Sequence, residues 1–124
     1  MDKQKGIAFC GLACCLCEEH PSCKGCRRGD CPEAGGCKPY QCAQTNGHEG
    51  CWECTEFPCD HGRFQSMRIR AFVAYCAQYG QAGLLSALEK GENIGLQYHY
   101  PGKLVGDYDT LPNENELISM LASL

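Results

Sequence analysis

Apolar side chains recur at the spacing of an α-helix between residues 64 and 79. The apolar positions lie three or four residues apart and so share one helix face: Phe64, Met67, Ala71, Phe72, Tyr75, Cys76 and Tyr79. Gln65, Arg68 and Gln78 fall on the opposite face. The pattern predicts an amphipathic helix that ends at Gly80, since glycine is the usual residue after the last helical turn.

Two shorter helices are predicted in the remaining chain. Three leucines between residues 84 and 88 predict a helix that stops at Gly91. Asn113, with Glu116 three residues later, predicts the N-terminal cap of another helix over residues 114–124.

The segment between these helices contains Pro101 and Gly102, a pair typical of a turn. We expect a short extended piece on either side of it.

Residues 7–61 show no sustained helical or strand periodicity and are rich in glycine and proline. Twelve of the thirteen cysteines lie between Cys10 and Cys59. This segment has too few large apolar side chains to offset the entropy of ordering it, so an external constraint such as a metal must contribute. We therefore predict a single domain over residues 1–124 with a small α+β fold. An irregular, metal-stapled N-terminal half with zinc-knuckle-like turns (7–61) would pack on a helical C-terminal half (62–124).

Three Cys-x2-Cys units carry the chemistry of the N-terminal half: Cys14–Cys17, Cys23–Cys26 and Cys51–Cys54. A two-residue gap lets one tight turn direct both sulfurs at the same metal, so each unit supplies half of a tetrahedral site. In the second unit Gly25 stands where the turn favours a positive φ. Zinc, at two or three ions per chain, is the expected cofactor.

The spacing favours a particular grouping of the ligands. The preferred first site joins the second unit to later cysteines in a C-x2-C-x10-C-x4-C pattern: Cys23, Cys26, Cys37 and Cys42. The other site joins the first unit to the far end of the cluster: Cys14, Cys17, Cys51, Cys54 and Cys59. Cys10 is a further candidate ligand, and Cys31 and His61 are weaker ones. Cys15 is spare because neighbouring side chains point apart, and Cys76 is interpreted as a small buried apolar residue.

Iron is the main alternative to zinc, because four cysteine ligands do not distinguish the two metals by sequence. The triplet Cys10-x3-Cys14-x2-Cys17 matches a spacing that radical enzymes use for a cubane cluster. Those enzymes need a much longer barrel than 124 residues provide, so we regard this match as accidental. An iron–sulfur or thiol redox protein stays open as an alternative.

Charge and composition narrow the location and the partners. The formal net charge is −4, and thiolate-bound zinc would make it more negative, which argues against nucleic acid as a partner. Lys24, Arg27 and Arg28 lie next to cysteines and are expected to offset thiolate charge. The chain has no run of about 20 apolar residues and no signal-peptide pattern after Met1, so we expect a cytoplasmic protein that does not enter a membrane.

The cysteine segment also resembles a known family. The runs that carry the resemblance are Cys10-Gly11-Leu12-Ala13-Cys14, Cys17, Cys23-Lys24-Gly25-Cys26-Arg27, Cys37 to Cys42, Cys51-Trp52-Glu53-Cys54 and Glu56-Phe57-Pro58-Cys59. Over residues 7–61 they resemble an uncharacterised, cysteine-rich family of prokaryotic proteins described as zinc-binding, a domain of unknown function. Residues 100–102 and 106–109 look like the tail of some members. The resemblance implies metal binding without an established activity, and it makes ten cysteines pattern positions: Cys10, Cys14, Cys17, Cys23, Cys26, Cys37, Cys42, Cys51, Cys54 and Cys59. Cys15, Cys31 and Cys76 depart from the pattern.

Catalysis has one named candidate site. His99, Asp107 and Asp109 could converge beside the predicted turn, as metal ligands or as an acid and a base. The simpler interpretation is that both aspartates cap backbone amides in a loop. Closed four-thiolate sites are structural, so the leading hypothesis is a zinc-binding adaptor or binding module for an unknown protein or small molecule. The aromatic residues are a candidate contact surface or part of the core: Trp52, Phe57, Tyr98 and Tyr100.

Overall fold

A computed structural model describes residues 1–17, 23–28, 36–59 and 64–124. It contains three α-helices: α1 (Lys38–Asn46), α2 (Met67–Asn93) and α3 (Glu114–Ser123). Short 3₁₀ turns precede or separate the helices: η1 (Cys14–Leu16) and η2 (Cys26–Arg28) lie before α1, η4 (Cys51–Glu53) lies before α2, and η5 (Asp107–Asp109) lies before α3. The described ranges contain no strand, so the prediction of an α+β fold is wrong.

The expected extended pieces around Pro101-Gly102 approach each other without forming a ladder. Tyr100 N–H donates to the carbonyl of Val105 at 2.8 Å, and Asp107 N–H donates to that of Gln97 at 2.8 Å. The N–H of Gln97, however, donates to the carboxylate of Asp107 at 2.7 Å instead of to a backbone carbonyl. A side chain thus takes the place of the backbone acceptor that a strand pair requires.

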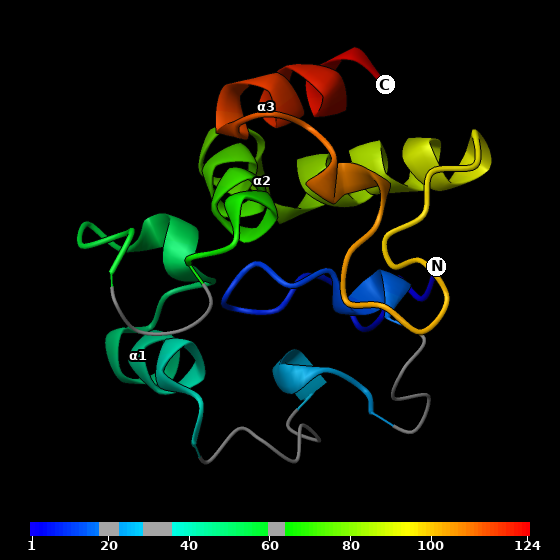
Figure 1. Ribbon diagram of the computed structural model, residues 1–124. Helices are drawn as coiled ribbons and strands as arrows, with labels where there is room; N and C mark the ends of the chain where they lie inside the picture. Colours follow the sequence, from blue (N-terminus) through cyan, green and yellow to red (C-terminus); the bar gives the residue numbers. More distant parts are fainter. Residues whose placement is uncertain (18–22, 29–35, 60–63) are drawn as a thin grey trace.

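Helix α2 combines the two helices predicted for this region. Its N-cap is Ser66, whose hydroxyl accepts the N–H of Ile69 at 3.4 Å. At Gly80 the backbone takes φ 77° and ψ 169°, which only glycine adopts readily, so the break expected there is confirmed. The two halves join without a loop, and Figure 1 shows the helix changing direction. The second half continues past Gly91, which is buried inside it, to Asn93.

Helix α3 lies over α2 and closes the larger core (Figure 1). The predicted cap is confirmed, because the Asn113 side chain accepts the N–H of Glu116 at 2.9 Å. The core contains fully buried side chains from both helices and from η5: Phe72, Leu84, Leu88, Tyr108, Leu117 and Leu121. One residue of the expected polar face behaves differently, since Arg68 is only 5% exposed and pairs with Asp109. Tyr79, expected on the apolar face, is 48% exposed.

The cysteine segment contacts the first half of α2. Ile69 and Val73 form a smaller core with Phe64, against which Trp52 and Phe57 pack. The N-terminal residues lie along α2 as well, where the N–H of Ile7 donates to the Gln81 side chain at 3.0 Å. No helix in the described part of the chain is both long and apolar enough to cross a membrane.

Candidate metal centre

Two of the Cys-x2-Cys units each form a 3₁₀ turn of the same kind. In η1 the N–H of Cys17 donates to the carbonyl of Cys14 at 3.1 Å, and in η4 the N–H of Cys54 donates to that of Cys51 at 3.1 Å. In each unit the first cysteine begins the turn and the second is its C-cap, so one tight turn separates the two residues. This is the local arrangement that a tetrahedral half-site requires.

Backbone amides point at sulfur in two of the three units. In the remaining unit Gly25 has the expected positive φ of 89°, and its N–H donates to Cys23 Sγ at 3.4 Å. The N–H of Glu56 donates to Cys54 Sγ at 3.4 Å in the same way. Both amides would also suit a metal-bound thiolate, because the charge on the sulfur strengthens such bonds.

One group of thiols surrounds Cys14. Burial raises the pKa of the Cys14 thiol to about 12, and electrostatic repulsion from nearby cysteines adds to it: Cys26, Cys10, Cys17 and Cys23. Two Cys-x2-Cys units therefore lie within electrostatic range of each other. We call Cys14, Cys17, Cys23 and Cys26 the first cysteine set.

A second group surrounds Cys51. Burial again raises its pKa to about 12, with added repulsion from Cys10, Cys59, Cys54 and Cys42. Four of these cysteines line one cavity: Cys42, Cys51, Cys54 and Cys59. We call them the second cysteine set. His48 and Glu56 line the same cavity, together with apolar side chains that include Phe57 and Phe64.

This grouping differs from the one expected from spacing. Cys23 and Cys26 interact electrostatically with Cys14 of the first unit, and Cys42 lines the same cavity as the last unit. The reason is helix α1: Cys37 is its N-cap and Cys42 lies five residues later, a rotation of about 140° at 3.6 residues per turn. The two side chains of this pair therefore point in different directions, and Cys37 joins neither set.

The cysteines gather without forming a finished site. Among residues 1–17, 23–28, 36–59 and 64–124, no three or more His, Cys, Asp or Glu side chains are arranged to hold a metal ion. The two raised pKa values keep Cys14 and Cys51 as neutral thiols, and a cation between the sulfurs would be needed to deprotonate them. The donor chemistry of both sets suits zinc, while the positions of the sulfurs are not those of a coordinated ion.

The other cysteines fall outside the two sets. Cys10 is buried in a turn, where the N–H of Gly11 donates to the carbonyl of Ala8 at 2.9 Å, and it interacts electrostatically with both sets. Cys15 and Cys76 are buried in the larger core. The weaker candidates Cys31 and His61 lie outside the described residues.

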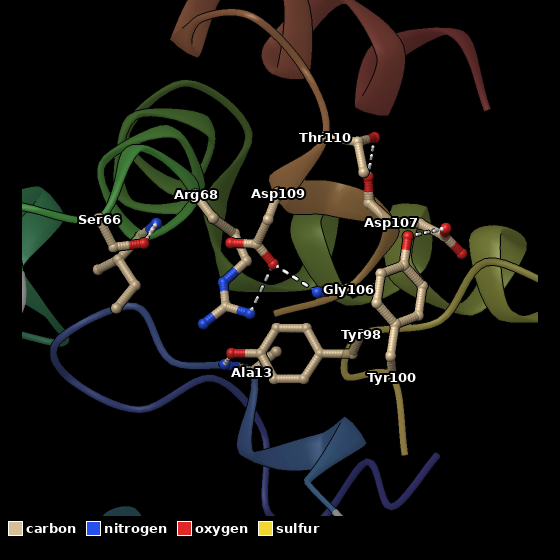
Figure 2. Close-up of polar contacts among 10 residues, drawn as sticks. Ala13, Ser66, Arg68, Tyr98, Tyr100, Gly106, Asp107, Asp109 and Thr110 are labelled. Atoms are coloured by element: carbon tan, nitrogen blue, oxygen red, sulfur yellow. Dashed lines mark hydrogen bonds and ion pairs between the residues drawn. The ribbon is translucent and has the colours of Figure 1, made fainter. Parts of the chain in front are cut away.

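The alternative catalytic site is occupied by structural contacts (Figure 2). Asp107 accepts the hydroxyl of Tyr100 at 2.7 Å as well as the N–H of Gln97. Asp109 accepts the N–H of Gly106 at 2.8 Å and pairs with Arg68 at 3.3 Å. The interpretation of both carboxylates as caps of backbone amides is confirmed. The third member, His99, stacks on Tyr98 with ring centroids 4.5 Å apart.

The aromatic residues proposed as a contact surface belong mainly to the cores. Tyr98 is buried and stacks on Phe72 at 6.2 Å between ring centroids, and Phe57 meets Phe64 edge to face at 5.0 Å. Trp52 is half-buried and packs against both cores.

Sequence reasoning gave no preference to His48, which lines the cavity of the second set. Its position one residue after Gly47, the C-cap of α1, was the available signal. Recognising that signal required the helix to be predicted first, and it was not.

Comparison with known proteins agrees with the resemblance in part. A model of the family DUF3795, described as a protein of unknown function, matches residues 18–63. The match contains the whole second cysteine set and Cys23 and Cys26 of the first. No curated protein and no solved structure matches the chain.

Proposed function

We propose that this protein binds two zinc ions, one through each cysteine set, and that the metals hold its N-terminal half together. The observation that carries the proposal is the cavity lined by Cys42 from α1 and by Cys51, Cys54 and Cys59 from a later segment. Two parts of the chain thus bring four sulfurs to the same space. The first set supports the proposal with two further units close to each other.

The energetics of the cysteine segment support a structural role for the metals. Within the described part of residues 16–59, which carries most of the candidate ligands, the buried apolar side chains are the small ones of Pro39 and Ala43. A core this small cannot offset the entropy of ordering the segment. One structural zinc contributes on the order of 10 kcal/mol in small peptides, which is comparable to the stability of a whole domain.

A structural role for the metal places the activity elsewhere. A closed four-thiolate site leaves no open coordination position for a substrate. In this proposal the protein is a binding or adaptor module, and its partner contacts the remaining surface. An iron–sulfur or thiol redox protein is the alternative, since the same eight cysteines suit iron.

Elemental analysis of protein purified without oxygen tests the proposal. We expect two zinc ions per chain and no iron. Iron with a matching amount of sulfide would contradict zinc binding and support the redox alternative. A chain that folds and binds neither metal would contradict the proposal.

Two serine variants test the grouping of the ligands. Cys54→Ser should lower the zinc content from two ions to one, because the second set loses a ligand. Cys37→Ser is the matched control and should keep two ions, since Cys37 belongs to neither set. A loss of zinc in Cys37→Ser would restore the grouping expected from spacing.

A further inference from the structure

Arg27 directly follows Cys26 of the first cysteine set, and its side chain extends toward the second set. Its Nε donates to the carbonyl of Ile7 at 2.5 Å, and its Nη2 donates to the carbonyl of Glu49 at 2.6 Å. Glu49 comes two residues before Cys51. One guanidinium therefore fixes the backbone on the N-terminal side of the second set's turn.

The faces of the guanidinium contact two aromatic rings. Its central carbon lies 4.4 Å from the centroid of Phe9 and 5.4 Å from that of Trp52. Trp52 stands between Cys51 and Cys54 in η4. A planar cation at these distances is attracted to the ring faces, so Arg27 also holds the side chain inside the Cys-x2-Cys unit.

A second network ties the same contacts to the helical half. Gln81 of α2 accepts the N–H of Ile7 at 3.0 Å and donates to the Glu49 carboxylate at 3.1 Å. The N–H of Cys51 donates to the carbonyl of Phe9 at 2.8 Å. The acceptors and rings that Arg27 uses are thus held in place by α2 and by each other.

The charge of Arg27 also suits a position beside the first cysteine set, because it interacts electrostatically with Cys26 and Cys14. A zinc ion with four thiolates carries a net charge of about −2, and the guanidinium is half-buried where that charge would act. Arg28, the next residue, is exposed and donates to the side chain of Gln4 at 3.1 Å. The two neighbouring arginines therefore have the same charge and very different surroundings.

We propose that Arg27 is a positioning residue that couples the two cysteine sets, so that metal binding at one set raises the affinity of the other. This inference rests on the proposed function. Metal at the first set fixes Cys26 and with it the backbone that carries Arg27. The guanidinium then holds the Glu49 carbonyl and Trp52 in the arrangement that presents Cys51 and Cys54. A set whose turn is already ordered loses less entropy when it binds its own metal, and the coupling is reciprocal.

Native mass spectrometry of the full chain tests the coupling, because it counts chains with no, one and two metal ions. The reduced, metal-free protein is titrated with zinc under argon. At one equivalent of zinc we expect the natural protein to be mainly metal-free or doubly loaded. In Arg27→Met the singly loaded form should become the main species, with the ratio of the two stepwise affinities changed by about fivefold or more. Arg28→Met, which removes the same charge from an adjacent position, should match the natural protein.

Arg27→Lys separates positioning from charge. Lysine keeps the positive charge but lacks the planar fork that reaches two carbonyls and two rings, so its loading pattern should resemble that of Arg27→Met. If Arg27→Lys loads as the natural protein does, charge alone suffices and the positioning role is wrong. This variant also serves as the test if Arg27→Met does not fold.

The outcomes separate this inference from the proposed function. A natural protein that binds no metal contradicts both. If the two zinc ions fill independently in the natural protein, the coupling is wrong and zinc binding stands. If the Arg27→Met and Arg28→Met variants load with identical cooperativity, the role of Arg27 in the coupling is wrong and zinc binding again stands. A merely structural role for Arg27 would weaken both affinities equally and leave their ratio unchanged.

Discussion

Replacing Asp109 by asparagine removes one charge from a buried ion pair that joins α2 to η5 (Figure 2). The side chain of Arg68 is 6% exposed and that of Asp109 is 19% exposed, so neither charge is fully solvated. Arg68 Nε is buried without a hydrogen-bond partner among the described residues, and its guanidinium lies 4.3 Å from the ring centroid of Tyr98. The arginine therefore has little to compensate for the loss of its carboxylate.

The magnitude follows from which contacts survive. Breaking a buried pair by removing one partner costs about 3 to 5 kcal/mol, because the remaining charge stays buried. The asparagine side chain would keep an oxygen that accepts the N–H of Gly106, so we expect Asp109→Asn to lower the free energy of unfolding by about 3 kcal/mol. Asp109→Ala also loses the Gly106 bond at 2.8 Å and should cost about 4 to 5 kcal/mol.

Urea unfolding followed by circular dichroism, on proteins with equal zinc content, measures these differences. Asp107→Asn is the matched control, because this carboxylate lies two residues away and accepts hydrogen bonds without a cationic partner. It should change the unfolding midpoint much less. If Asp109→Asn is no more destabilising than Asp107→Asn, Asp109 does not compensate the charge of Arg68 and the reasoning fails.

Smaller changes test other parts of the fold. Tyr108→Phe should leave the melting temperature unchanged or raise it slightly, because the buried hydroxyl has no hydrogen-bond partner in the part of the chain that the structure describes; a loss above about 1 kcal/mol would indicate a partner. Gly91→Ala should cost about 1 to 3 kcal/mol in urea unfolding, since a Cβ there would overlap the Tyr108 hydroxyl, and an unchanged value would mean that the ring moves freely. Asn113→Ala should cost about 1 kcal/mol in the same assay through the lost cap of α3, whereas no change would show that the end of the helix is frayed. Burial raises the pKa of Cys76 from 9.0 to about 12, so the folded state favours the neutral thiol and stability should fall as the pH rises from 9 toward 12; Cys76→Ala should weaken this dependence, and an identical pH profile would contradict it.

The helical half could be predicted because its signals are local. Helical spacing, the break at Gly80 and the cap at Asn113 each depend on neighbours within a few residues. The predicted end of α2 differs from the observed one by two residues. Gly91 does not end the helix; it leaves room for the Tyr108 hydroxyl, which approaches the helix closely at this position. The pattern wrongly places Arg68 on the polar face, because a local pattern cannot show its ion pair with Asp109, which lies 41 residues further along the chain.

The grouping of the cysteines that we propose differs from the one that spacing predicts. It depends on the N–H of Cys51 bonding to Phe9, a contact between distant segments, and on helix α1 separating Cys37 from Cys42. Helix α1 itself had visible signals in Pro39 near its start and Gly47 after its end. Interpreting those two residues as helix boundaries would have removed Cys37 from the first site.

The change of direction at Gly80 divides α2 into two arms, residues 67–79 and residues 81–93. The smaller core, with Trp52 and Phe57 of the cysteine segment packed against it, is attached to the arm before the bend through Ile69 and Val73. Leu84 and Leu88 on the other arm anchor the larger core. Amide hydrogen exchange should therefore report metal loss mainly on the first arm, because the second keeps its own packing. In engineering terms, Ser86 and Lys90 are exposed positions at which a label can be attached away from Gln81, the residue of this arm that bonds to Ile7 and Glu49.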